Sequence, residues 1–240
     1  MRYFLIAILV LSVSFTACKK DKDTPPPVEN KPTLTLGFSV DNQALEFDKI
    51  QYKNAAGNNY SVTKLLFYIS AFEFEKKTGE KVLLDNVFLV DARDPQKISF
   101  TLPNLPFGDY KSVKFLIGLD SLHNIDNGLP NTLDNVNMAW PTMMGGGYHF
   151  MKLEGNFLAD TTSYGYAMHL GKNKNRVPIE IIQNFSISNN SNQIKLKMNL
   201  NEWYQSPANY DFNIDGNYSM HDSTAMAKLV QNGMDVFTLN

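Results

Sequence analysis

The segment from Met138 to Gly155 carries the side chains of this chain that are best suited to chemistry. It contains Trp140, His149, four of the ten methionines and three consecutive glycines. Imidazole and thioether groups are among the ligands that copper binds readily. The segment is therefore the first candidate for a metal site, provided that the elements around it bring these groups together.

Two histidines lie in segments whose side chains alternate as in β-strands, residues 148–153 and 164–170. With strict alternation, His149 shares a face with Met151, and His169 shares a face with small residues that leave room for a ligand. The short connection predicts that the two segments pair as a hairpin. The two histidines would then lie within cross-strand reach of each other.

Two imidazoles that meet across a hairpin would suit copper or zinc. A long loop is expected over residues 120–147, because turn residues and glycines are frequent there. A thioether from Met138, Met143 or Met144 in this loop, or from Met151, would favour Cu(I), the softer ion. The loop and the hairpin together would then form one site.

Each of these side chains also has an ordinary structural explanation. A histidine in a strand is often a hydrogen-bonded structural residue, methionines such as Met151 fill cores, and Trp140 would serve as a packing anchor. Packing explains Met143 less well, because it lies beside three glycines. His123 follows a predicted strand with Asp120 nearby, which makes it a further candidate for lining or ligating the site.

The fold is predicted from an alternation of apolar and polar residues with a period of two, as in residues 33–40. Turn residues separate about ten short segments of this kind. A late helix is expected over residues 223–232, with Asp222 or Ser223 as its N-cap and Gly233 as its end. These features predict a mainly β fold, an antiparallel β-sandwich with a short C-terminal helix.

The N-terminus has the pattern of a lipoprotein signal. Residues 1–17 join a basic residue to an apolar run that is too short to span a bilayer comfortably. Cys18, the only cysteine, follows small residues as in a bacterial lipobox, so we expect it to be lipidated. Residues 18–32 predict a disordered Pro/Lys/Asp tether, and residues 33–240 the folded domain. The expected location is the bacterial cell envelope, periplasmic or surface-exposed.

The charge and the missing motifs exclude several classes of function. The formal net charge is −2, so there is no basic field to attract nucleic acid. The chain has no Gly-x-Ser-x-Gly, no His-Glu-x-x-His and no phosphate-binding loop. We therefore expect no nucleic-acid partner and no enzymatic turnover.

Several motifs, taken together and in order, make the chain similar to the MbnP-like copper-binding proteins. They are Tyr60–Ser70, Gly118–Ser121, Met138–Trp140, Gly147–Gly155 and Met168–Gly171. The resemblance implies an exported β-sandwich that binds copper, with His149, His169 and Trp140 as candidate site residues. It also implies a dihaem peroxidase-like partner, because a tryptophan is oxidised to kynurenine in such relatives. Thr142 stands where those relatives carry a second tryptophan.

These observations predict an exported, lipid-anchored protein that handles or acquires copper with a haem-protein partner. The expected metal ligands are His149, His169, Met138 and Met143, and the expected site-lining residues are Trp140 and His123. The alternative is a binding module without a metal, which would recognise a glycan, peptide or protein of the envelope through the aromatic-rich loop.

Overall fold

The computed structural model describes residues 30–240. The predicted signal peptide (residues 1–17), the predicted lipidation site Cys18 and most of the predicted tether lie outside the described residues. Within residues 30–240, no helix is both long enough and apolar enough to cross a membrane.

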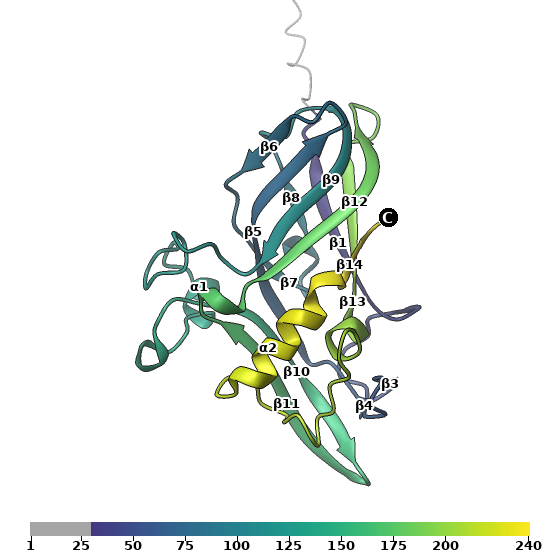
Figure 1. The fold of residues 1–240 in the computed structure, drawn as a ribbon, viewed down its shortest axis with the longest axis vertical. Coiled ribbons are helices and arrows are strands. Elements are labelled where there is room, and N and C mark those ends of the chain that lie inside the picture. Colours follow the sequence, from purple (N-terminus) through teal and green to yellow (C-terminus); the bar gives the residue numbers. More distant parts are fainter. Residues whose placement is uncertain (1–29) are drawn as a thin grey trace, which may run out of the picture.

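The described chain forms two β-sheets with short helices around them (Figure 1). The smaller sheet contains β1 (Thr33–Val40), β2 (Gln43–Ala44), β8 (Ser99–Thr101), β13 (Gln193–Asn199) and β14 (Phe237–Leu239). The larger sheet contains β3 (Tyr52–Lys53), β4 (Asn59–Tyr60), β5 (Lys64–Lys76), β6 (Lys81–Leu84), β7 (Phe88–Asp91), β9 (Gly108–Ile117), β10 (His149–Ala159), β11 (Thr162–Gly171) and β12 (Val177–Ile187). The predicted mainly β sandwich is confirmed.

Within the larger sheet, the path β12-β9-β5-β10-β4-β3 places the long strand β5 between β9 and β10. β11 pairs with β10, and both β6 and β7 pair with β5. The helices are α1 (Leu133–Asn137), α2 (Ser223–Asn232) and the 3₁₀ helices η1 (Pro95–Lys97), η2 (Thr142–Met144), η3 (Asn173–Asn175), η4 (Leu200–Tyr204) and η5 (Gly233–Asp235). The segment between β9 and β10, which carries α1, projects from one side of the molecule in Figure 1.

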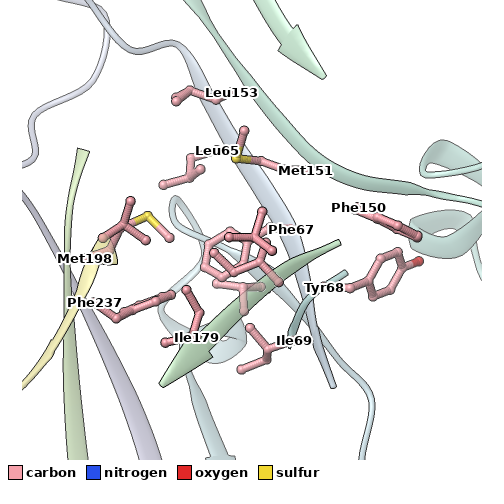
Figure 2. Packing of buried hydrophobic residues seen from close by; sticks show 14 of the residues in the cluster. Leu65, Phe67, Tyr68, Ile69, Phe150, Met151, Leu153, Ile179, Met198 and Phe237 are labelled. Atoms are coloured by element: carbon pink, nitrogen blue, oxygen red, sulfur yellow. The ribbon is translucent and has the colours of Figure 1, made fainter. Parts of the chain in front are cut away.

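The core lies between the two sheets, where aromatic rings from both layers meet edge to face. The ring of Phe38 in β1 lies 6.2 Å from that of Phe67 in β5, and Phe237 in β14 lies 5.4 Å from Phe115 in β9. Such pairs each add about 0.5–1.5 kcal/mol beyond the burial of their area. Figure 2 shows Phe67, Phe237 and the sulfur-bearing Met198 among the buried side chains of this layer.

One strand pair departs from the antiparallel pattern. β1 and β13 run parallel, with Thr33 opposite Gln193 and Ser39 opposite Asn199. The two strands are far apart in the sequence, so their direction depends on the path of the whole chain and not on the residue pattern of either strand.

The loop expected over residues 120–147 is not devoid of regular structure, because it contains α1 and η2. The side chain of Thr132 accepts a hydrogen bond from Asn135 N and so caps the first turn of α1. The expected C-terminal helix is present, and Asp222 accepts hydrogen bonds from Thr224 N and Ala225 N at its start.

Gly155 in β10 is fixed by close packing. A Cβ there would overlap the carbonyl oxygen of Ser61 and the ring of Tyr166. Neither group can move cheaply, so Gly155→Ala should lower the free energy of unfolding by about 3 kcal/mol, as measured by urea denaturation. Gly165→Ala is the matched control on β11, since the nearest atom to its Cβ would be the Tyr218 hydroxyl at 3.5 Å. Equal stability of the two variants would contradict this prediction.

Candidate metal centre

The pairing of β10 with β11 contains a β-bulge next to His149. His149 lies opposite Gly171, but Met151 lies opposite the residue just before Gly171, so Phe150 is an extra residue on β10. A bulge of this kind re-aims the side chains on one side of it. His149 therefore shares the face of Gly171 and His169, while Met151 remains in the core (Figure 2).

The expectation that His149 and Met151 share a face is thus wrong, but the two histidines do lie within reach of each other. The ring centroids of His149 and His169 are 5.0 Å apart, with the ring planes at 89°. Because metal–imidazole bonds are about 2.0–2.1 Å long, rings at this separation are close enough to bind one ion. His149 is only 5% exposed, so bulk water is largely kept from it.

His169 is held by a carboxylate that spacing along the sequence did not reveal. Its Nε2 lies 2.9 Å from Oε1 of Glu154, and Oε2 of Glu154 accepts a hydrogen bond from Lys64 Nζ at 2.8 Å. The hydrogen bond from His169, together with Lys64, lowers the pKa of Glu154 to about 2. An ionised carboxylate can only accept, so Nε2 of His169 is the donor, and in the neutral ring this leaves the lone pair on Nδ1.

Cross-strand register explains why Glu154 reaches His169. Lys152 lies directly opposite His169, and Glu154, two residues further along β10, is its diagonal neighbour on the same face. In the predicted hairpin, a carboxylate on the same face as a histidine and diagonal to it across the strand pair would have indicated this residue.

Backbone hydrogen bonds bring Trp140 to the same cluster. His149 N donates to Met138 O at 2.6 Å, and Trp140 N donates to Gly147 O at 2.8 Å, so this part of the loop runs beside the start of β10. The indole centroid lies 4.7 Å from that of His149. The indole packs on Gly171, where a Cβ would overlap it. Its Nε1 is buried and has no hydrogen-bond partner in the described part of the chain.

An open recess of about 590 Å³ lies beside Trp140. Its lining includes Tyr148, Asp126, Asn135 and the exposed apolar side chain of Val136. The recess brings the molecular surface close to an indole that is itself only 2% exposed.

Comparison with known proteins now assigns the family. A model described as MbnP matches residues 29–223, which is most of the chain. The chain belongs to the MbnP family. Its structure is similar to that of MbnP from Methylosinus trichosporium, with a TM-score of 0.59, 15% sequence identity and coverage of 88% of this chain and 98% of that one. At this identity the likeness shows the fold alone. No curated protein matches the sequence.

Membership of the MbnP family suggests a copper-related function, and the donors at this cluster fit such an ion. Burial, with smaller contributions from Lys152 and His169, lowers the pKa of His149 to about 3, so its ring is neutral at physiological pH. Nδ1 of His149 lies 3.2 Å from the carbonyl oxygen of Met138, and the backbone of Ala139 also hydrogen-bonds this ring. Nδ1 of His169 has no hydrogen-bond partner within residues 30–240, so it is available to a metal ion.

The structure places the two predicted methionine ligands differently. The side chain of Met138 is fully buried in the hydrophobic core, and its carbonyl oxygen accepts from His149 N and lies 3.2 Å from His149 Nδ1. The side chain of Met143 is 94% exposed, so it does not pack against the buried ring of His149. A local sequence cannot show this, because burial depends on how the loop folds back. The ring of His123 lies against Asp120, with its Nδ1 2.9 Å from Oδ2 of that residue.

The depressed pKa of His149 predicts a pH-dependent stability of the metal-free protein. The unfolded chain takes up a proton at this ring below about pH 6.5, whereas the folded chain does not until about pH 3. Stability is therefore full above pH 6.5 and falls as the pH drops, by about 2 kcal/mol between pH 7 and pH 5. The low pKa of Glu154 likewise makes the folded protein less stable as the pH falls, but only below about pH 4.5, the ordinary pKa of this group.

Urea unfolding at pH 7 and pH 5 measures this difference. His149→Gln should flatten the pH dependence, and His221→Gln, which changes an exposed histidine, should leave it as in the wild type. An unchanged difference in His149→Gln would contradict the prediction.

Proposed function

We propose that this member of the MbnP family binds copper through His149 and His169 and has no turnover of its own. The observation that supports the proposal is a pair of shielded imidazoles whose ring centroids lie 5.0 Å apart, with no hydrogen-bond partner on Nδ1 of His169 among residues 30–240. Glu154 orients one ring, and the carbonyl oxygen of Met138 orients the other. The copper ion would be the cargo that the protein carries, and the two shielded imidazoles would be its ligands.

The donor set favours copper over zinc. Zinc sites normally have four protein ligands, or three and a water. Here the nearby carboxylate, Glu154, already bonds His169 and Lys64, and the side chain of Met143 is 94% exposed. Two neutral imidazoles in a buried place leave zinc under-coordinated and add no charge to balance it. A singly charged ion is easier to hold there.

The proposal includes an envelope location and a protein partner. A lipid at Cys18 would tether the domain through residues 18–32, so the domain itself would need no membrane-binding face. A haem protein that oxidises Trp140 would have to dock at the recess, since that is where the surface approaches the indole. Large apolar side chains are exposed on the same loop, at Leu133, Val136 and Met143, as is common at protein-binding surfaces.

Titration of the protein with Cu(I) and Zn(II), in competition with chelators, tests the ligands. The wild type should bind one Cu(I) in preference to Zn(II). The His149→Ala/His169→Ala double variant should bind Cu(I) more than 100-fold more weakly, because loss of a single outer partner already costs about 10–100-fold. Glu154→Gln should cost about tenfold by releasing the ring of His169.

His221→Ala is the control, since it removes an exposed histidine at the start of α2. Full Cu(I) affinity in the double variant would refute the assignment of ligands. A wild type that is free of copper after native purification, and binds none on titration, would instead support a metal-free binding module that uses the recess beside Trp140.

The intact mass of the protein from envelope membranes tests the anchor and the tryptophan. We expect a chain that begins at Cys18 and carries acyl groups, and Cys18→Ser should retain an uncleaved, unacylated N-terminus. If a haem partner acts on the protein, Trp140 should show a net gain of one oxygen and loss of one carbon, as in kynurenine. A chain with an unmodified Cys18 would overturn the proposed anchor.

A further inference from the structure

A second set of metal-ligating side chains lies outside the histidine cluster. One ligand atom from each of Asp85, Asp120 and His123 lies within 4.8 Å of the other two. Among residues 30–240, no other three side chains of these types have ligand atoms that converge this closely. No hydrogen bond, ion pair or ring contact joins it to His149 or His169 in the described part of the chain.

The three residues come from two strand ends that flank β5. Asp85 directly follows β6, and Asp120 and His123 follow β9, while both strands pair with β5. Oδ1 of Asp120 accepts hydrogen bonds from Leu122 N at 2.8 Å and from His123 N at 2.9 Å. The carboxylate of Asp120 is thus held in place by its own loop, and the ring of His123 is only partly exposed.

The charges of this cluster are not balanced by the protein. Asp85 forms no ion pair or hydrogen bond among residues 30–240, and the partners of Asp120 are His123 and two backbone N–H groups. By contrast, the equally acidic loop near Asp215 receives the ammonium of Lys228 at 2.6 Å. Two neighbouring carboxylates without lysine or arginine repel each other, and a bound cation would relieve that repulsion.

We propose that Asp85, Asp120 and His123 bind a divalent first-row cation such as Zn²⁺. Two carboxylates and one imidazole form a harder, doubly charged donor set, which suits Zn²⁺, Co²⁺ or Mn²⁺ and disfavours Cu(I). The site would be independent of the proposed copper function, because it shares no ligand with the histidine cluster.

A cation there would also brace the loop that carries Trp140. Just after His123, the side chain of Asn124 accepts a hydrogen bond from Tyr148 N, and Asp126 accepts one from Gly147 N. These bonds tie the start of the loop to its end. Fixing Asp120 and His123 to the end of β6 would therefore anchor the backbone that leads into β10.

Titration of the metal-free full chain, purified in detergent, with Co²⁺ tests the proposal, followed by displacement with Zn²⁺. We expect one equivalent of Co²⁺ to bind with visible d–d absorption. Asp85→Asn and His123→Gln should each weaken binding at least tenfold, since even outer-shell changes cost about 10–100-fold. The His149→Ala/His169→Ala variant should bind as the wild type does, and so should Asp160→Asn, which changes an acidic residue at a hairpin turn.

Nuclear magnetic resonance gives a readout that does not depend on a variant. Zn²⁺ should shift the imidazole resonances of His123 before those of His221 or His169. Unchanged Co²⁺ affinity in both Asp85→Asn and His123→Gln would overturn the proposal. So would loss of the bound Co²⁺ in the His149→Ala/His169→Ala variant, or Zn²⁺ shifts confined to the other histidines.

Discussion

The candidate metal centre depends on one extra residue in β10. If β10 and β11 paired without a bulge, His149 would point into the core with Met151, and His169 would stand on the opposite face. Phe150 absorbs the extra length, so that His149 turns onto the face of His169 while the core pairing resumes at Met151. Bulges are common where a sheet must re-aim a side chain. Gly118 accommodates this one: its φ is +122°, and a Cβ there would lie 2.8 Å from the ring of Phe150.

The bulge also decides what can cover the histidines. Opposite His149 stands Gly171, whose missing side chain lets the indole of Trp140 lie against the strand. The indole in turn covers the ring of His149, and that burial keeps the imidazole neutral. The positive φ angles of Gly145, Gly146 and Gly147 let the loop reverse tightly enough to place Trp140 there. The glycines therefore serve the position of the tryptophan, and Met143 is left in solvent.

Residue alternation predicted the sandwich, the hairpin and the C-terminal helix because each is encoded in a short window of sequence. Alternation gave the wrong face for His149, because the extra residue of the bulge interrupts the period of two. No glycine or proline at the bulge itself indicates the interruption in the sequence. Glu154 was missed because its contact with His169 is diagonal across two strands, and Asp85 because its partners follow β9, three strands later in the chain. The parallel pairing of β1 with β13 was missed for the same reason. In each case the deciding contact spans residues that no local pattern connects.

Carboxylates show how surroundings assign different roles to the same group. Glu154 is flanked by Lys64 and His169, so its charge is already balanced, and it can fix a ring without drawing a cation to itself. Asp120 lies equally close to the imidazole of His123, and a carboxylate oxygen of Asp85 lies within 4.8 Å of both, yet neither aspartate forms an ion pair with lysine or arginine in the described residues. A bound cation would reduce their mutual repulsion. The same side-chain chemistry thus positions a ligand for a soft ion in one place and offers direct ligands to a harder ion in the other.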